Sequence, residues 1–205
     1  MLCDQAFIPR ELHNIPIFGH AARLNHGSKY KTTPLYDALK KSLGKDLLFG
    51  GAHDPDKRYE VKVAVTSTDE IGKKAIVIAN YSRSGELNPS SDFHRPDNPS
   101  LELELWEAAA ATSAVSPFFK PFYHKATEQT YFDGAFYNNN PVLVAYRECK
   151  LLWPEVAQCH PDIFLSLGTG QNTKQMAPEI ERHRRSMPHR SHAYVLLTPI
   201  IFVNH

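Results

Sequence analysis

Short apolar segments typical of β-strands alternate along this chain with segments of helical spacing, and that alternation constrains the fold more than any other feature. The valines at 61, 63 and 65 alternate with Lys62 and Ala64, which is the period of two of a strand. The continuous apolar run at 75–79 is typical of a strand buried on both faces. Residues 130–132 and 162–167 predict two further strands. The alternation predicts an α/β domain with a largely parallel sheet.

Three helices and one long loop are expected in the rest of the chain. Residues 33–44 predict a helix, because a Thr-Pro pair opens the segment and a glycine closes it. A second, alanine-rich helix is expected to begin at Ser100 and to stop before Pro117, and a third begins at the Asn-Pro pair of residues 140 and 141. Residues 81–99, rich in Ser, Asn, Asp and Pro, predict the long loop.

The composition is that of a globular chain with no drive toward nucleic acid. Hydrophobic residues make up 42% and charged residues 22%, which are ordinary shares. Lys and Arg together number 23 against 22 for Asp and Glu, and a net charge of +1 gives no overall attraction to nucleic acid. The longest apolar stretch, residues 193–203, is well short of the roughly 20 residues of a membrane span. No signal peptide is visible. We expect a cytoplasmic protein with at most a peripheral membrane contact.

Neither the cysteines nor the histidines predict a metal or cofactor site. Cys3, Cys149 and Cys159 form an odd set without C-x-x-C spacing and indicate free thiols. The histidines and arginines of residues 182–192 have no helical His spacing with a carboxylate, which favours a solvated basic tail. The glycine-flanked turn at 168–170 is similar to a phosphate-binding turn. It lacks the Walker lysine and the third glycine of a dinucleotide fingerprint, so nucleotide binding is a minor alternative.

An aspartate at the end of a predicted strand is the first candidate for chemistry. Ligand sites of open parallel α/β sheets lie at the carboxyl ends of strands. Asp133 follows an apolar strand and precedes Gly134, so its carboxylate is expected to project from a tight turn at the sheet edge. Taken alone, Asp-Gly is a common turn dipeptide, and a purely structural role is the more frequent one.

Two further groups of polar residues accompany this aspartate along the chain. Asn139 and Asn140, followed by Pro141, can bond nearby backbone groups, orient a carboxylate and cap the next helix. Ser113 can bond a turn where the alanine-rich helix ends, ahead of the stop at Pro117. Each group taken alone is explained by a capped turn or by a helix end.

In their order along the chain, these segments resemble the patatin-like phospholipase family, most closely its eukaryotic FabD/lysophospholipase-like branch. The resemblance runs from about residue 5 to residue 170. The blocks that carry it are Val63-Ala64-Val65-Thr66-Ser67, Asn80-Tyr81, Trp106-Glu107-Ala108, Ala111-Thr112-Ser113-Ala114 with Pro117 and Phe119, Asp133-Gly134-Ala135, Asn139-Asn140-Pro141, Trp153-Pro154 and Ser166-Leu167-Gly168-Thr169-Gly170.

The resemblance implies a three-layer α/β/α fold and acyl-ester hydrolysis by a Ser-Asp dyad without a cofactor. Residues 1–170 would form the patatin-like domain, and residues 171–205 a basic and then apolar tail of unknown role. Asp133 aligns with the dyad aspartate. Its carboxylate would accept the serine proton while backbone N–H groups hold the oxyanion. Burial would have to raise its pKa from the ordinary value of about 3.9. The supporting motifs would be formed by Gly134, Asn139, Asn140, Pro141, Ser113 and Pro117.

The nucleophile half of that dyad is missing from the sequence. The chain contains no Gly-x-Ser-x-Gly elbow and no glycine-rich oxyanion segment. The resemblance therefore implies a domain that is incomplete at its N-terminus, with the first strand–elbow–helix unit before residue 1. Ala135 also stands where the family usually has a second glycine. We expect a chain that is inactive alone, whose open sheet edges favour self-association or flanking domains of a longer parent.

Two functions of different class follow from these observations. The first is the aspartate-bearing part of a lipid acyl hydrolase, whose parent cleaves acyl esters of phospholipids or lysophospholipids at a membrane surface. The second is a catalytically inactive fragment that binds lipid or a protein partner. Turnover once a serine is supplied favours the first, and binding without turnover favours the second.

Overall fold

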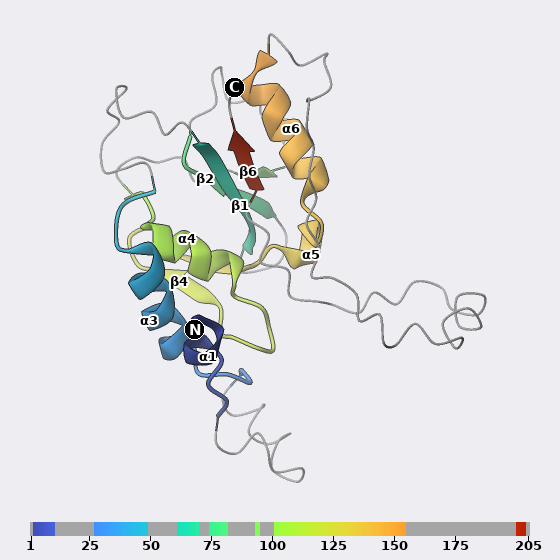
Figure 1. Ribbon diagram of the computed structural model, residues 1–205. Coiled ribbons are helices and arrows are strands. Elements are labelled where there is room, and N and C mark those ends of the chain that lie inside the picture. Colours follow the sequence, from blue (N-terminus) through green and yellow to red (C-terminus); the bar gives the residue numbers. More distant parts are fainter. Residues whose placement is uncertain are drawn as a thin grey trace, which may run out of the picture.

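The computed structural model describes residues 2–10, 27–48, 61–69, 74–81, 93–94, 101–154 and 200–203 (Figure 1). The helices are α1 (Leu2–Ala6), α3 (Thr32–Leu43), α4 (Leu105–Thr112), α5 (Ala135–Asn138) and α6 (Val142–Leu152). The strands are β1 (Val61–Asp69), β2 (Ala75–Ala79), β3 (Phe93–His94), β4 (Phe122–His124), β5 (Gln129–Asp133) and β6 (Ile200–Val203).

Strand β1 is the centre of the sheet. The strand order is β3-β2-β1-β5-β4, and β6 pairs with β1 off this path. One edge of β1 pairs with β2, whereas the opposite edge is divided between two partners. β6 pairs with residues 61–64 of β1, and β5 pairs with residues 67–69. The end of β5, and with it Asp133, is therefore held directly against the last residues of the central strand.

The sheet is mixed, and the expectation of a largely parallel sheet is not met in the part of the chain that the structure describes. β1 is antiparallel to β2, β5 and β6, and β4 is antiparallel to β5, while β2 and β3 are parallel. The reason lies in the short connections, because a parallel crossover needs a dozen residues or more. Residues 70–74 and 125–128 are too few for one, so each joins a hairpin. The strand predicted at 162–167 lies outside the described residues.

Helices cover both faces of the sheet, as the predicted α/β/α layering requires. Ile76 and Ile78 of β2 belong to the core formed with α3 and α4, whereas Val77 and Ala79 pack with Val144 of α6. Successive side chains of a strand point to opposite faces, so α4 and α6 lie on opposite sides of the sheet (Figure 1). This position confirms that β2 is buried on both faces, which explains its continuous apolar sequence.

Helix α4 begins later than the sequence predicted, at Leu105 rather than at Ser100. Glu104 and Glu107 form a capping box, in which the Glu104 N–H donates to the Glu107 carboxylate at 2.9 Å. Just before the helix, Leu103 and Glu104 pair with another segment: the Leu103 carbonyl accepts a hydrogen bond from the Leu48 N–H at 2.9 Å, and Glu104 forms a β-bridge with Leu47.

The remaining helices agree with the sequence except for one short addition. α3 confirms the first predicted helix and ends at Leu43. Gly44 follows as its C-cap, with a φ of 74° and an N–H that donates to the Lys40 carbonyl. α6 confirms the third. α5 was not predicted, because its four residues are too few for a helical pattern to emerge. It places one helical turn directly after Asp133 and Gly134.

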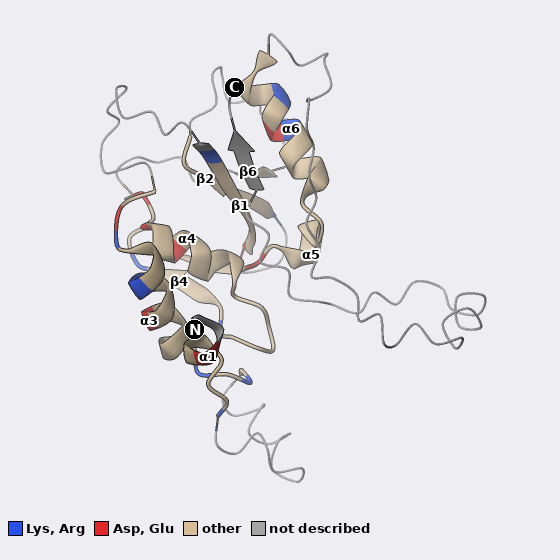
Figure 2. Ribbon diagram, in the orientation of Figure 1, with Lys and Arg blue, Asp and Glu red and all other residues tan. Residues whose placement is uncertain are grey.

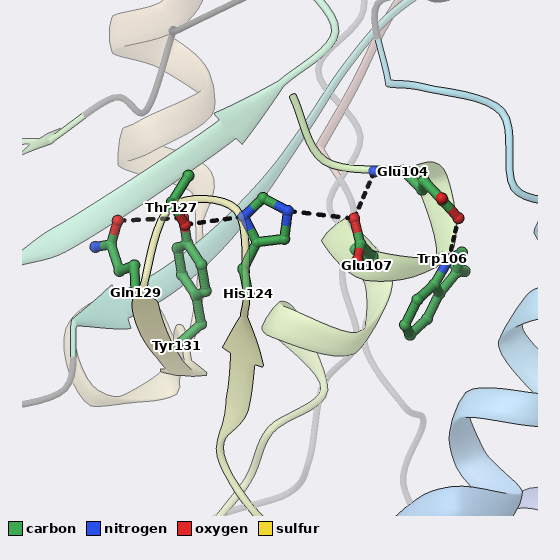
Figure 3. A network of polar contacts seen from close by, with 7 residues as sticks. All are labelled: Glu104, Trp106, Glu107, His124, Thr127, Gln129 and Tyr131. Carbon is green, nitrogen blue, oxygen red and sulfur yellow. Dashed lines mark hydrogen bonds and ion pairs between the residues drawn. The ribbon is translucent and has the colours of Figure 1, made fainter. Parts of the chain in front are cut away.

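A polar network fixes the β4–β5 hairpin against α4 (Figure 3). His124 of β4 is buried, and its Nδ1 lies 2.8 Å from Thr127 Oγ1 in the hairpin turn. Its Nε2 lies 3.5 Å from the Glu107 carboxylate on α4. On the next strand the Tyr131 hydroxyl donates to Gln129 Oε1 at 3.2 Å. The network therefore holds the strand that leads to the candidate site in place.

Candidate functional site

Asp133 is the last residue of β5, and both of its backbone polar groups are bonded. Its N–H donates to the carbonyl of Ala114, in the segment after α4, at 3.1 Å. Its carbonyl accepts a hydrogen bond from Thr68 Oγ1 on β1 at 3.0 Å. The Cα of Ser67 is its register partner on β1. Two segments that are distant in sequence, β1 and the residues after α4, thus fix the aspartate, which is only 7% exposed.

The environment of the Asp133 carboxylate makes it a stronger base than an ordinary aspartate. Burial raises the pKa of Asp133 to about 6, and hydrogen bonds from the backbone N–H groups of Ala135 and Gly134 offset part of that rise. A general base works best when its pKa lies near the working pH. The burial effect that the proposed chemistry requires is therefore present in the structure.

Gly134 permits a close approach between the turn and the central strand. A Cβ at this position would lie 2.7 Å from the backbone carbonyl carbon of Thr66 and closer still to Thr66 Oγ1. Its φ of −71° is open to any residue, so space and not backbone angle requires the glycine. Ala135 begins α5 with helical backbone, a conformation that suits alanine. The substitution of the second family glycine is thus compatible with the local fold.

The asparagines and proline after α5 order the start of α6. Asn140 Oδ1 accepts a hydrogen bond from the Val142 N–H at 3.2 Å, which is the local bond expected of an asparagine ahead of a helix. The Pro141 carbonyl accepts from the Ala145 N–H at 2.9 Å. Asn139 and Asn140 are both exposed. Orientation of the Asp133 carboxylate by these asparagines stays a prediction.

Ser113 and Pro117 flank the segment that reaches the site. Ser113 is buried, and its Oγ donates to the Ala109 carbonyl at 2.5 Å, so the hydroxyl bonds its own helix. Pro117 follows a cis peptide bond, is exposed, and accepts a hydrogen bond from the Lys29 N–H at 2.7 Å. Contact with the site comes instead from the Ala114 carbonyl. The Gly168-Thr169-Gly170 turn lies outside the described residues.

The hydroxyl residues of β1 are parts of the site whose roles the sequence did not reveal. Thr68 bonds the Asp133 carbonyl, and Thr66 packs against Gly134. Ser67 is fully buried, and its Oγ donates to the Phe132 carbonyl at 2.6 Å, so a substrate cannot reach it. The run of three consecutive hydroxyl residues, Thr66, Ser67 and Thr68, was the signal available in the sequence.

We expect Asp133→Asn to stabilise the fold, by an amount that grows with pH. Because the folded pKa lies above the unfolded value, the ionised carboxylate lowers the free energy of unfolding as the pH rises from about 4 through about 6. A rise of about two pKa units corresponds to about 3 kcal/mol. Urea unfolding at pH 4.5 and pH 8 measures the difference. Asp37→Asn, at an exposed position of α3, is the control. An equal effect of Asp133→Asn at both pH values would contradict the burial argument.

The part of the chain that the structure describes lacks two features of other protein classes. No group of three or more His, Cys, Asp or Glu side chains is placed to hold a metal ion there. Among the helices of that same part of the chain, none has both the length and the apolar character to cross a membrane.

Comparisons with known proteins agree with the resemblance read from the sequence. The chain is 28% identical over 142 residues to human calcium-independent phospholipase A2-gamma, covering 69% of this chain and 17% of that protein. It is 28% identical over 161 residues to the cGAMP-activated phospholipase of Escherichia coli, covering 76% of this chain and 39% of that protein. It is 34% identical over 89 residues to the Arabidopsis thaliana protein named "Probable inactive patatin-like protein 9", covering 40% of this chain and 23% of that protein.

The chain thus spans less than a fifth of the human relative and less than half of the bacterial one. A family model described as Patatin-like phospholipase matches residues 9–146, which is more than half of the chain and includes Asp133, Gly134 and the start of α6. The chain therefore belongs to the patatin-like phospholipase family.

Proposed function

We propose that this chain carries the aspartate half of a lipid acyl hydrolase that cleaves acyl esters of phospholipids or lysophospholipids. The observation that carries the proposal is the buried Asp133 carboxylate, whose pKa of about 6 suits a general base near neutral pH. Membership in the patatin-like phospholipase family supports the substrate class. Cytoplasmic localisation and flanking domains of a longer parent stay predictions.

In the proposed reaction, Asp133 takes the proton of a serine hydroxyl as its oxygen attacks the ester carbonyl. Backbone N–H groups stabilise the oxyanion, and the proton then passes to the departing alcohol. In the second half, water attacks the acyl carbon of the acyl-serine while Asp133 accepts a proton from the water. The bond between the serine oxygen and the acyl carbon then breaks, Asp133 returns the proton to the serine oxygen, and the fatty acid leaves. The serine is supplied by a Gly-x-Ser-x-Gly elbow that these 205 residues do not contain.

The test is to restore the missing half. A fusion places the oxyanion loop and the Gly-x-Ser-x-Gly elbow of a patatin-like relative before residue 1, and fatty-acid release from lysophosphatidylcholine is measured for the fusion and for the 205-residue chain. We expect release by the fusion and none by the chain alone, since loss of a serine nucleophile lowers turnover on the order of a million-fold. A folded fusion without release would contradict the proposal.

A fluorophosphonate probe gives a second readout on the unfused chain. The probe labels an activated serine, so we expect no labelling of the folded 205-residue chain. Labelling that disappears in Asp133→Asn would show that a serine within these residues is activated by Asp133, and the half-site proposal would be wrong.

The second candidate is an inactive module that binds lipid or a protein partner. Absence of the elbow motif favours it, as does the similarity to a plant protein that is named inactive. A module of this kind binds its target without turnover in the fusion as well. Its affinity is unchanged by Asp133→Asn, because the carboxylate then has no role.

A further inference from the structure

Large apolar side chains are exposed on the two helices that follow Asp133. Phe136 on α5 is 69% exposed and Leu143 on α6 is 70% exposed, the two highest values among the large hydrophobic residues that the structure describes. Tyr137 and Leu151 are exposed on the same two helices. A concentration of this kind marks an interaction surface, whereas single exposed apolar residues are ordinary.

The exposed residues of α6 fall on one side of the helix. Positions 143, 147 and 151 are four residues apart and lie above one another, with position 150 on the same side. All four are exposed, while Val144, Ala145 and Glu148 on the other side are buried against the sheet. We define the α5–α6 face by the exposed residues Phe136, Tyr137, Leu143, Arg147, Lys150 and Leu151.

The exposed charges of this face are positive. Between residues 134 and 153 the charged residues are Arg147, Glu148 and Lys150. Glu148 is fully buried and accepts a hydrogen bond from the Tyr81 hydroxyl at 2.9 Å, which leaves the two basic residues at the surface. Figure 2 shows no charged residue on α5, with the charges of α6 gathered away from the α5 end.

We propose that the α5–α6 face docks on an anionic phospholipid surface, an inference that rests on the proposed lipid hydrolase function. Phe136 and Leu143 enter the interface, and Arg147 and Lys150 bind the anionic head groups. A second copy of the chain fits this face less well, because a symmetric dimer would bring the same positive charges together. Since α5 begins two residues after Asp133, docking brings the carboxylate to the lipid surface.

Vesicle co-sedimentation of the 205-residue chain tests the proposal without any turnover. We expect binding to vesicles of phosphatidylcholine mixed with phosphatidylserine, weak binding to phosphatidylcholine alone, and loss of the difference at high salt. Phe136→Ser/Leu143→Ser lowers binding by about tenfold or more, because two apolar side chains no longer leave water. Arg147→Gln/Lys150→Gln removes the preference for anionic vesicles.

The matched control is Leu43→Ser/Tyr123→Ser, which changes two exposed apolar residues on α3 and β4. It is expected to bind vesicles as the unchanged chain does, and circular dichroism verifies that each variant folds. Equal loss of binding in this control overturns the proposal, as does absence of binding by the unchanged chain. A dimer in analytical ultracentrifugation that Phe136→Ser/Leu143→Ser dissociates also overturns it in favour of a second copy. Vesicle binding is measured without turnover, so it does not depend on fatty-acid release by the fusion. The two proposals can therefore fail independently of each other.

Discussion

Replacing Asp133 with asparagine in the fusion that supplies the serine is expected to lower fatty-acid release by about 10⁴-fold. Asparagine keeps the size of the side chain and can still accept hydrogen bonds from the backbone, but it cannot accept the serine proton. The loss should therefore lie in kcat, with KM changed little, because the carboxylate acts on the reacting hydroxyl. Steady-state kinetics with lysophosphatidylcholine measures both constants.

The pH profile gives this prediction a second signature. Since burial raises the pKa of Asp133 to about 6, kcat/KM of the fusion should rise with pH through that value as the carboxylate ionises. The control is Asp37→Asn in the same fusion, which should leave the rate and the profile unchanged. If Asp133→Asn retains more than a tenth of the activity, Asp133 is not the general base. Asp133→Asn is expected to stabilise the fold while it lowers the rate, so a loss of activity in this variant cannot be explained by unfolding.

Replacing Gly134 with alanine is expected to lower the free energy of unfolding by about 3 kcal/mol, at the upper end for overpacking of a buried position. The added methyl group would lie 2.7 Å from the Thr66 carbonyl carbon and closer to its Oγ1. Backbone atoms of a central strand cannot move aside at low cost, so β5 and β1 must separate. Urea denaturation of the 205-residue chain measures the loss.

A comparison with a second glycine and a rescue variant make this prediction specific. In Gly44→Ala the added methyl group has no close neighbour, and only the positive φ of 74° is unfavourable. This variant is expected to lower the free energy of unfolding by about 1 kcal/mol. Thr66→Gly combined with Gly134→Ala removes the side-chain part of the clash, so it should recover part of the stability relative to the sum of the single variants. An effect of Gly134→Ala no larger than that of Gly44→Ala would show that the close approach is not tight.

Much of the site could be predicted because its signals are local in the sequence. The apolar run of β2 indicated a strand buried on both faces, and the Thr-Pro pair and Gly44 set the ends of α3 to within two residues. Asp133 was identified from a strand followed by a turn and from its order among the other family blocks. Local pattern, turn chemistry and motif order all agreed at these positions.

The features that the sequence did not predict depend on pairing between segments that are distant along the chain. Strand direction is not encoded in an apolar pattern, so the hairpins β1–β2 and β4–β5 were missed. The start of α4 depended on the capping box of Glu104 and on a backbone bond between Leu48 and Leu103. The need for glycine at 134 became visible only when β1 and β5 were placed side by side.

The division of one edge of β1 between β5 and β6 has a consequence for synthesis of the chain. The register partner of Val61 is Val203, so the first half of β1 cannot form these backbone hydrogen bonds until β6 has been synthesised. A ribosome that adds about 5–20 residues per second needs on the order of ten seconds to pass from one to the other. During that interval the emerging β1 presents unpaired backbone groups that can accept a strand of another chain. Binding of a chaperone to nascent chains is therefore expected to be strongest before residues 200–203 emerge.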